Sequence, residues 1–453
     1  MLACLVASAM VVPALIERPN IIVLFADDAG YADFGFTGHP TIRTPHLDRL
    51  AAEGMVFTQF YSGAPVCTPS RYALLTGREP RRSGIDEAAV LFPKSRKGIH
   101  EREITVAELL REQGYATAIF GKWHLGVPNE NNGYATNRLP LSHGFDEYFG
   151  LPYSNDMIGS NVPPIPLLEG PVVPGHERYK GYRVVEFKPD QKTIWKRYTE
   201  HAVDFVRRNS DRPFFLYLPF SMPHIPLHPG EDFVETSRRG KYGDVIEEID
   251  WSVGQIVNEV RRLGISDRTL VIFTSDNGPW LPFKQDGGSA GMFRDGKGTT
   301  WEGGMHVPCV AWWPGVVPAN RKNMVPASVL DLLPTAAELS GAALPSDRVI
   351  DGRSIVSLLR GSEEFPDRPI FYMDSGGKKL FAVRYGPWKL KVKMKSNATP
   401  AQFKGKEPLL FNIEIDPGEQ WNLADKHPDI VQQLLKMIEF QDDSVEDEGT
   451  FWD

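Results

Sequence analysis

The sequence predicts an α/β fold with a large, mainly parallel central sheet flanked by helices, followed by a small C-terminal part with an antiparallel sheet and a helix. Two observations predict this. Up to about residue 340, continuous apolar segments alternate with segments of helical spacing, and strands that are apolar throughout are typical of parallel sheets buried on both faces. Beyond that point apolar and polar residues alternate, as in antiparallel strands with one exposed face.

The first expected strand, NIIVLFADD at 20–28, is apolar until it ends in two carboxylates. The segment TPHLDRLAAEG then has helical spacing and a glycine stop. Three more helix–strand units follow: ITVAELLREQG with YATAIFGKWH, WKRYTEHAVDFVRRN with PFFLYLPFSMPH, and YGDVIEEIDWSVGQIVNEVRRLG with TLVIFTSDNG. VPCVAWWPG adds one more strand. This alternation is typical of a sheet covered by helices.

The C-terminal segments RPIFYM, KLFAVRYGPWKLKVK and PLLFNIEIDP alternate in polarity, and DIVQQLLKMIEFQ is a helix that would cover them. We therefore expect an α/β domain at 18–342 and an α+β subdomain at 343–453, with the boundary near ALPSDRVIDGRS. The stretch at 1–16 is uncharged and apolar but too short for a confident membrane span, and we expect residues 1–17 to be a secretory signal peptide. The alternative for this stretch is a buried first strand.

Composition excludes some classes of partner. The chain has 453 residues and a formal net charge of −8, and no stripe of Lys and Arg suggests a nucleic-acid surface. We expect no nucleic-acid partner and no membrane span in the mature chain. The basic cluster Arg78, Arg81 and Arg82 is interpreted as a solvated loop, with the border of an anion site as the alternative. A single glycosylation sequon, at Asn397, favours a bacterial periplasmic or secreted protein over a glycosylated lysosomal one.

The three cysteines are too few for a disulfide framework. Cys309 lies in the apolar run HVPCVAWW and is interpreted as a core thiol, whereas Cys4 falls within the predicted signal peptide. Cys67 differs from both, because PVCTPSRYALLTGREP surrounds it with turn formers and polar residues. A buried structural thiol is not expected in that setting.

Polar residues follow the expected strands at their carboxyl ends, where sites form in open α/β sheets. Asp27 and Asp28 follow the first strand, and Asp276 and Asn277 follow a later one. Three carboxylates close together without a counter-cation are unfavourable, so a bound cation is the simplest explanation. Oxygen donors without a cluster of thiolate or imidazole favour calcium or magnesium over zinc. Each residue alone also fits a helix cap or a turn, but their joint position favours a metal site.

Four cationic or protonatable side chains are expected at the same edge: Lys122, His124, His224 and Lys297. Lys297 lies in RDGKGTTWEGG, a glycine-rich loop that can bring backbone close to a ligand. Each of the four alone is explained as a solvated loop charge. Together they suit a tetrahedral anion held beside a divalent metal.

The segment Cys67-Thr-Pro-Ser-Arg71, followed by Leu75-Thr-Gly-Arg78, resembles the C-x-P-S-R and L-T-G-R motif of type I sulfatases. Further segments resemble sulfatases in the same order along nearly the whole chain: PNIIVLFADDAGYADFG, GKWHLG, PHIPLHPG, SDNG, GKGTTWEGG, AWWPG and DPGEQWNLA. KGTTWEGG with AWWPG is similar to the arylsulfatase A and N-acetylgalactosamine-6-sulfatase branch. The resemblance implies an alkaline-phosphatase-like α/β sandwich with a small C-terminal subdomain.

The resemblance also implies what Cys67 is for. In that family an installing enzyme oxidises the cysteine to formylglycine, an aldehyde whose hydrate carries two hydroxyls on one carbon. One hydroxyl attacks sulfur and releases the alcohol, and the other loses its proton so that the aldehyde re-forms and sulfate leaves. A serine nucleophile would leave a sulfate ester that still needs attack by water.

Site roles carry over residue by residue. Asp27, Asp28, Asp276 and Asn277 are expected to hold one calcium ion together with an oxygen of modified Cys67. The catalytic residues implied are Cys67, Arg71, Lys122, His124, His224 and Lys297.

Within that set, the resemblance implies that Arg71 and calcium lower the pKa of the attacking hydroxyl and that Lys122, His224 and Lys297 bind the sulfate oxygens. His224 or Lys297 protonates the leaving oxygen, and His124 accepts the proton that triggers sulfate release. Ser70 is expected to support the site or the recognition signal, and His228 is a weaker candidate for touching substrate.

The expected activity is hydrolysis of sulfate monoesters, with a sulfated saccharide as natural substrate and aryl sulfates as surrogates. A formylglycine-dependent phosphodiesterase or phosphonate monoester hydrolase is one alternative, and an inactive protein that binds sulfated glycans is another. Alkaline-phosphatase zinc chemistry is disfavoured because the extra histidine ligands are not evident. The loops expected to build the rest of the pocket contain four candidate sugar contacts, which are equally explained as ordinary loop residues: His100, Tyr153, Asp156 and His176.

Overall fold

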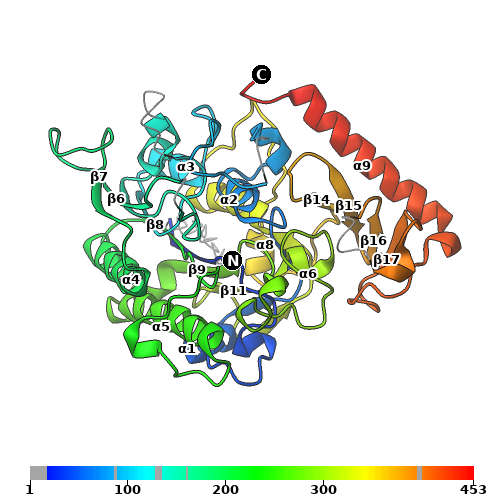
Figure 1. Ribbon diagram of the computed structural model, residues 1–453, viewed down its shortest axis with the longest axis horizontal. Helices are drawn as coiled ribbons and strands as arrows, with labels where there is room; N and C mark the ends of the chain where they lie inside the picture. The colour runs from blue at the N-terminus through cyan, green and yellow to red at the C-terminus, as the bar shows by residue number, and fades with distance from the viewer. Residues whose placement is uncertain (1–17, 86–88, 128–134, 160–161, 395–399) are drawn as a thin grey trace, which may run out of the picture.

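The computed structural model describes residues 18–453, apart from 86–88, 128–134, 160–161 and 395–399. The predicted signal peptide and the sequon at Asn397 therefore lie outside the described residues. A large sheet with helices on both faces forms most of the molecule, and a smaller sheet lies to one side with a long helix against it (Figure 1).

The large sheet has ten strands: β1 (Asn20–Ala26), β2 (Met55–Phe57), β4 (Ala116–Phe120), β5 (Glu147–Gly150), β6 (Pro166–Gly170), β7 (Arg183–Phe187), β8 (Phe214–Pro219), β9 (Thr269–Ser275), β11 (Cys309–Trp312) and β12 (Arg321–Asn323). Their order is β12-β2-β11-β9-β1-β8-β4-β5-β6-β7. The central run from β9 to β5 is parallel. Antiparallel pairings involve β11 on one side and β6 and β7 on the other. The prediction of a parallel sheet is confirmed at its centre, and the whole sheet is mixed.

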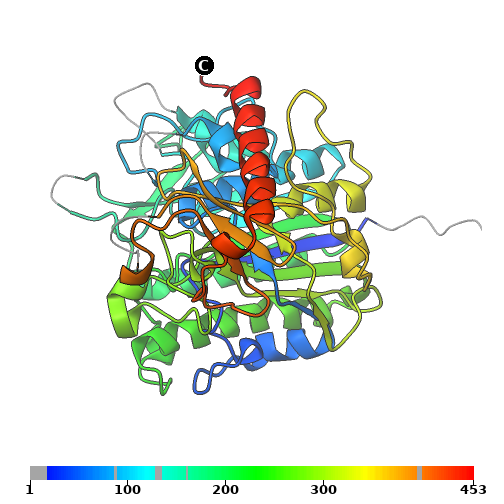
Figure 2. The same cartoon turned by 90° about the vertical axis from the view of Figure 1, so that its right-hand side faces the viewer.

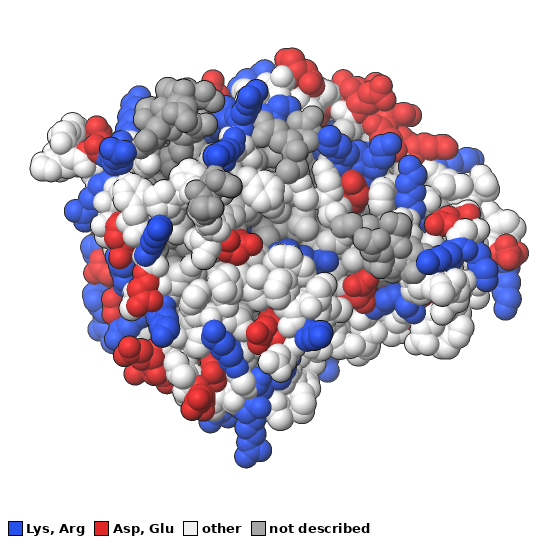
Figure 3. Space-filling model, in the orientation of Figure 1, with Lys and Arg blue, Asp and Glu red and all other residues white. Residues whose placement is uncertain are grey.

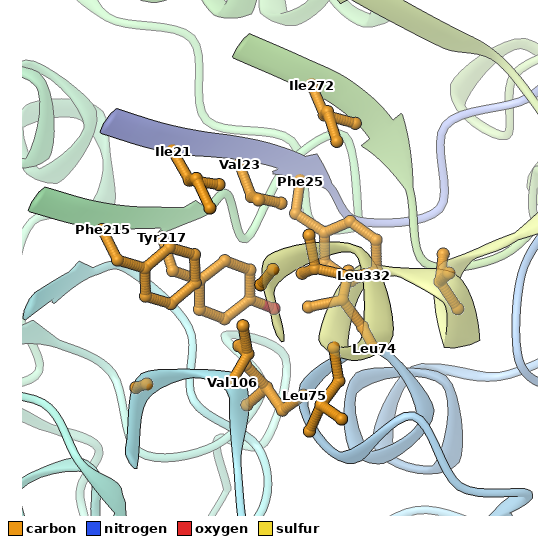
Figure 4. Close-up of a cluster of buried hydrophobic side chains, with 14 of the residues drawn as sticks. Ile21, Val23, Phe25, Leu74, Leu75, Val106, Phe215, Tyr217, Ile272 and Leu332 are labelled. Atoms are coloured by element: carbon orange, nitrogen blue, oxygen red, sulfur yellow. The ribbon is translucent and has the colours of Figure 1, made fainter. Parts of the chain in front are cut away.

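Strand β1 lies in the middle and separates two hydrophobic cores. Ile21, Val23 and Phe25 point toward one core, and the alternate residues Ile22 and Leu24 point toward the other. Figure 4 shows the first set pointing to the same side as residues of β8 and toward side chains of the helices on that face. Both faces of the strand are buried, which is why its sequence is continuously apolar.

Helices cover the two faces in separate groups, and Figure 2 shows the strands running between a lower and an upper helical layer. One layer contains α1 (Pro45–Glu53), α4 (Gln191–Arg208) and α5 (Lys241–Arg262); the other contains α2 (Cys67–Thr76), α3 (Val106–Glu112) and α7 (Leu332–Ser340). The short helices α6 (Glu302–Met305) and α8 (Val356–Leu359) complete the set that belongs to this part. Helix α2 ends at Gly77, whose φ of 67° is the left-handed conformation that glycine adopts without strain.

A three-stranded sheet lies near the junction with the C-terminal part: β3 (Phe60–Tyr61), β10 (His306–Val307) and β13 (Ala327–Ser328). The C-terminal sheet is antiparallel, with the strands β14 (Ile370–Met373), β15 (Leu380–Tyr385), β16 (Trp388–Lys391) and β17 (Leu409–Asn412). Helix α9 (Pro428–Glu448) packs on one face of it (Figure 2). The predicted sheet and covering helix are confirmed. The boundary at 342 stays a prediction, and α8 beyond it packs in the core of the large sheet.

The basic cluster of residues 78–82 is not the solvated loop that the sequence suggested. Arg78 and Arg82 are fully buried. The Arg82 guanidinium donates to Asp351 and to Glu448 of α9, and Arg78 also donates to Glu448. Buried guanidinium groups require such partners. These arginines therefore hold α9 on the large domain.

Lys and Arg side chains are interspersed with Asp and Glu on the face shown in Figure 3. Among the described residues, each helix is too short or too polar to cross a bilayer. The expectation that nucleic acid is not a partner stays a prediction.

Candidate active site

The predicted site residues converge at the carboxyl ends of adjacent strands. Asp27 and Asp28 follow β1, and Asp276 and Asn277 follow β9 directly beside it. Lys122 and His124 follow β4, and His224 follows β8. Parallel pairing of β9, β1, β8 and β4 brings these ends to one edge of the sheet, as the sequence predicted.

Cys67 is the first residue of α2 and lies against the acids of β1. Its Sγ atom is 3.4 Å from Oδ1 of Asp27 and 4.0 Å from Oδ1 of Asp28. One ligand atom from each of Asp27, Asp28, Cys67 and His224 lies within 4.8 Å of the others. The cluster thus contains three of the predicted metal ligands and adds His224.

Asp276 and Asn277 adjoin this cluster. The backbone N–H of Asp28 donates to Oδ1 of Asp276, and Nδ2 of Asn277 donates to Oδ1 of Asp28. Asp28 has a φ of 67°, a left-handed conformation that these hydrogen bonds stabilise. Within the described part of the chain, Oδ1 of Asn277 is buried without a hydrogen-bond partner. A buried amide oxygen left in this state is suited to a cation.

Arg71, one turn into α2, is fully buried between the acids. Its Nη2 donates to Oδ2 of Asp276 over 2.8 Å and lies 3.5 Å from Oδ2 of Asp27. Burial raises the pKa of Asp276 to about 7, and the nearby Asp27 carboxylate acts in the same direction against Arg71. Burial would also raise the pKa of Asp27, but Lys122 and Arg71 outweigh it and hold that pKa well below its usual value. The two acids thus share the charge of one guanidinium.

Lys122 and Lys297 come from distant parts of the chain, and each contacts one of the acids that follow β1. Nζ of Lys122 donates to Asp27 over 2.6 Å and to the Ser154 hydroxyl over 3.0 Å. Nζ of Lys297 donates to Asp28 over 2.7 Å. Burial would lower the pKa of both lysines, but the carboxylates Asp27 and Asp28 raise it above the usual value. Both side chains are therefore cations at neutral pH.

In each of the two site histidines, one ring nitrogen contacts a backbone carbonyl and the other does not. Nε2 of His124 lies 3.0 Å from the Leu91 carbonyl, which only accepts, so the proton is on Nε2 and Nδ1 carries a lone pair. That Nδ1 has no partner among the described residues, and burial holds the pKa of His124 well below its usual value. His224 bonds the Ile225 carbonyl through Nδ1, and its Nε2 is 3.6 Å from Asp28. Burial and Lys297 lower the pKa of His224.

The thiol of Cys67 is not an activated nucleophile. It is 2% exposed, and burial raises its pKa well above the usual value, with Asp27 acting in the same direction against Lys122 and Lys297. Nucleophilic cysteines have lowered pKa values because the thiolate is the reactive form. Chemistry at this position thus requires a group other than the thiol.

The structure also shows the surroundings of the secondary candidates. Ser70 accepts the Gly63 N–H and supports the turn before Cys67. The charges that act on His228 are Lys241, Asp190 and Lys192, none of which belongs to the acidic cluster. His100 packs against Phe451 and Trp452, and His176 is exposed.

Sequence reasoning missed Ser154. Its hydroxyl bonds Lys122, and it directly follows Tyr153, which is buried. Asp156 has a buried Oδ1 without a partner in the described chain. A serine in a loop carries no signal of its own, because its role depends on the lysine that the fold brings beside it.

Comparisons with known proteins match both parts of the chain. The family model described as Sulfatase matches residues 19–342, and the one described as the C-terminal region of aryl-sulfatase matches residues 365–450. The chain is 39% identical to N-acetylgalactosamine-6-sulfatase of Canis lupus familiaris, over 93% of this chain and 85% of that protein. It is 38% identical to arylsulfatase A of Homo sapiens, over 95% and 90%. The crystal structure of the PsFucS1 sulfatase from Pseudoalteromonas sp. superposes with a TM-score of 0.83 at 29% identity, covering 95% of this chain and 91% of that one.

Proposed function

The chain belongs to the sulfatase family, and from that premise we propose that it hydrolyses sulfate monoesters of saccharides with a formylglycine made from Cys67 and a bound calcium ion. Sulfate ester hydrolysis by the formylglycine mechanism is general to the family. The predicted alkaline-phosphatase-like sandwich and the resemblance to the arylsulfatase A and N-acetylgalactosamine-6-sulfatase branch are confirmed. The substrate class, the calcium ion and the residue roles are the proposal.

One observation carries the proposal: Cys67 lies in contact with Asp27 while Lys122 and Lys297 each contact an acid of the same cluster. A nucleophile position, a candidate metal site and two lysine ammonium groups thus meet at one place. A sulfate ester is an anion, and its leaving oxygen gains negative charge as the S–O bond breaks. The two lysines and a bound cation would stabilise both charges, because fixed positive groups act most strongly where water is excluded.

The residues present fit a hard divalent cation. The donors are the clustered carboxylates of Asp27 and Asp28, the adjoining carboxylate of Asp276, and the Asn277 oxygen, which has no hydrogen-bond partner within the described residues. Oxygen donors of this kind favour calcium, although His224 also lies within the cluster. Together the calcium and the formylglycine would supply a hydroxyl nucleophile of lowered pKa at the Cys67 position.

Arg71 fixes the acids that hold the cation. Its guanidinium bridges Asp276 and Asp27, and Nη1 donates to the Lys122 carbonyl, so it ties the ends of three strands together. Lys122 and Lys297 bind and orient the sulfate group. Both remain protonated at neutral pH, so each presents N–H donors to the sulfate oxygens and neutralises charge as the S–O bond breaks.

His124 and Lys297 move protons. His124 is neutral with a free lone pair on Nδ1, which is the form that a proton acceptor needs. Its backbone carbonyl accepts the hydroxyl of Thr68, the residue after Cys67, so the imidazole is held near the nucleophile position. Of the two candidates for protonating the leaving oxygen, Lys297 is the better supported, because it carries its proton. The lowered pKa of His224 and the contact of its Nδ1 with the Ile225 carbonyl leave Nε2 without a proton to donate.

A sulfated saccharide is the proposed natural substrate, since one relative that the chain matches over most of its length is named N-acetylgalactosamine-6-sulfatase. The proposed partner in maturation is a formylglycine-installing enzyme, which reads the segment Cys67-Thr-Pro-Ser-Arg71. We place the mature protein outside the cytoplasm, in the periplasm or secreted. The apolar character of residues 1–16 in the sequence supports this.

Peptide mass and turnover test the proposal together. The peptide containing Cys67, from protein made with an installing enzyme, is expected to be about 18 Da lighter than the cysteine peptide, because the S–H group is exchanged for an aldehyde oxygen. The same sample is expected to hydrolyse 4-nitrophenyl sulfate and to lose that activity on chelation of calcium. An unmodified thiol in active protein contradicts the formylglycine assignment.

Phosphate diesters separate the proposal from its rival. They resemble sulfate esters in shape but retain a second substituent, which needs room beside the two lysines. Bis(4-nitrophenyl) phosphate is expected to be hydrolysed at least about tenfold less efficiently than the aryl sulfate, a difference of about 1.4 kcal/mol in barrier. The reverse preference identifies a phosphodiesterase.

A further inference from the structure

The loop that carries Lys297 lies between the two halves of the active site. The N–H of Gly298 donates to the carbonyl of Pro65, two residues before Cys67, over 2.8 Å. The N–H of Lys297 donates to Pro279 over 2.9 Å. These bonds set the backbone of residues 296–304 against both the Cys67 turn and the residues that follow Asn277.

The other side of this loop faces the C-terminal subdomain. Nζ of Lys391, on β16, donates to the hydroxyl of Thr300 over 2.7 Å and lies 4.1 Å from the centre of the Trp301 ring. Lys391 is 1% exposed and Trp301 2%. Burial and the nearby Lys389 lower the pKa of Lys391 well below its usual value. Within the described residues, this amine donates to Thr300, which lies three residues after Lys297.

A second lysine of β16 holds the end of the same loop. Nζ of Lys389 is 2.9 Å from Glu302 and 3.0 Å from Glu419. Glu419 in turn accepts the backbone N–H of Glu302 over 2.7 Å. Glu302 also accepts the hydroxyl of Tyr61, on the strand that leads to the Cys67 turn. One buried charge cluster therefore joins the C-terminal sheet, the Lys297 loop and the approach to Cys67.

The alternation of β16 directs both lysines to this contact. Lys389 and Lys391 lie on one face of the strand, and Leu390 between them packs in the core beneath α9. Burying two lysines is costly, and apolar residues of similar size are often as stable. Stability alone therefore does not explain why these two positions are lysines. Their contacts with Thr300 and Glu302 do, because both contacts fix the backbone of the loop that carries Lys297.

We propose that Lys389 and Lys391 are positioning residues, through which the C-terminal subdomain fixes the 296–304 loop and sets the Lys297 ammonium against Cys67 and Asp28. This rests on the proposed function for the role of Lys297. The subdomain thereby takes part in sulfate binding without contacting sulfate. A displacement of about 1 Å in a substrate-binding group can cost about 100-fold in rate.

Lys391→Met tests the proposal, with Lys393→Met as the matched control. The first variant removes the bond to Thr300 and retains an unbranched chain over Trp301, whereas Lys393 is an exposed lysine two residues further on. We expect Lys391→Met to lower kcat/KM for 4-nitrophenyl sulfate by about 10-fold to 100-fold. The control is expected to stay within about twofold of wild type.

A double-mutant cycle with Lys297→Ala separates positioning from general stability. If Lys391 acts through Lys297, Lys391→Met has almost no further effect once Lys297 is alanine. The same cycle is measured as the Kd of 4-nitrophenyl sulfate by calorimetry in the Cys67→Ala background, where no turnover occurs. Equal losses with and without Lys297 overturn the proposal, as does an unchanged Kd in Lys391→Met.

Thr300→Val distinguishes loss of the hydrogen bond from misfolding of Lys391→Met. It removes the same bond by deleting the Thr300 hydroxyl, and the side-chain volume is conserved. It is expected to reproduce the loss seen with Lys391→Met, at a melting temperature that confirms a folded protein. If Thr300→Val is folded and binds as wild type does, the positioning role is wrong. If the protein with formylglycine binds the aryl sulfate but does not hydrolyse it, the proposed function is wrong. The positioning role is still tested in that case, because the double-mutant cycle measures Kd and needs no turnover.

Discussion

The sulfur of Cys67 lies 3.4 Å from a carboxylate oxygen of Asp27, in a site that excludes water. This contact favours a protonated thiol, since a thiolate there would face a negative charge at close range. The same oxygen is one of the proposed ligands of a divalent cation. A cysteine thiolate is thus disfavoured as a nucleophile at this position. The hydrated formylglycine proposed here carries hydroxyl oxygen in place of sulfur, and that oxygen can bind the same cation.

Cys67→Ser is expected to lower steady-state turnover of an aryl sulfate by more than about 1,000-fold. The serine hydroxyl has no second hydroxyl on its carbon, so sulfate transferred to it leaves only if water attacks the ester. Rapid-mixing measurements should therefore show at most one alcohol released per molecule. Cys309→Ala, which alters the buried thiol of β11, is the control and should retain turnover per folded molecule. Sustained turnover by Cys67→Ser contradicts the assignment.

Calcium is expected to raise the melting temperature, because it binds the folded state and relieves repulsion among Asp27, Asp28 and Asp276. A free concentration of 100 times the Kd corresponds to about 2.7 kcal/mol of added stability. Asn277→Ala should weaken this response by removing the buried amide oxygen. Thermal unfolding with calcium and with chelator measures it. Asn137→Ala, at an exposed asparagine, should respond as wild type does. An equal response in both variants removes Asn277 from the metal site.

His124→Asn is expected to lower kcat by about 100-fold or more, because the variant lacks the proton acceptor that assists sulfate release. Asparagine is chosen since His124 has a φ of 59°, a conformation that asparagine tolerates. Alcohol release should then show a burst equal to the enzyme concentration, followed by slow turnover. His46→Asn, at a partly exposed histidine of α1, is the control. A uniformly slower reaction without a burst places His124 in an earlier step.

Arg82→Met is expected to destabilise the fold by about 3 kcal/mol, because it leaves the carboxylates of Asp351 and Glu448 without their shared partner. Urea unfolding measures the loss. The effect on kcat per folded molecule should be small, since Arg82 serves the attachment of α9. Arg360→Met, at an exposed arginine, is the control. A large loss of kcat without a loss of stability contradicts this structural role.

Sequence patterns predicted the central sheet well, because a strand buried on both faces is apolar throughout. They also predicted where β1 and β9 end, since Asp27 and Asp276 interrupt the apolar runs. The same reasoning failed for Arg78 and Arg82, whose charges suggested solvent. Their burial depends on carboxylates far away in the chain, on α9 and near residue 351. Local composition carries no information about such partners.

The sequence by itself determined the α/β pattern, the identity of the acids and cations at the strand ends, and the unusual setting of Cys67. Each of these follows from local properties: periodicity, the end of an apolar run and the spacing of a short motif. Only the tertiary structure decided that β1 and β9 pair directly, that Ser154 meets Lys122, and that Lys389 and Lys391 brace the Lys297 loop. Those relations arise when distant segments pack together, and their energies depend on burial and on distances of a few ångströms, which no single segment specifies.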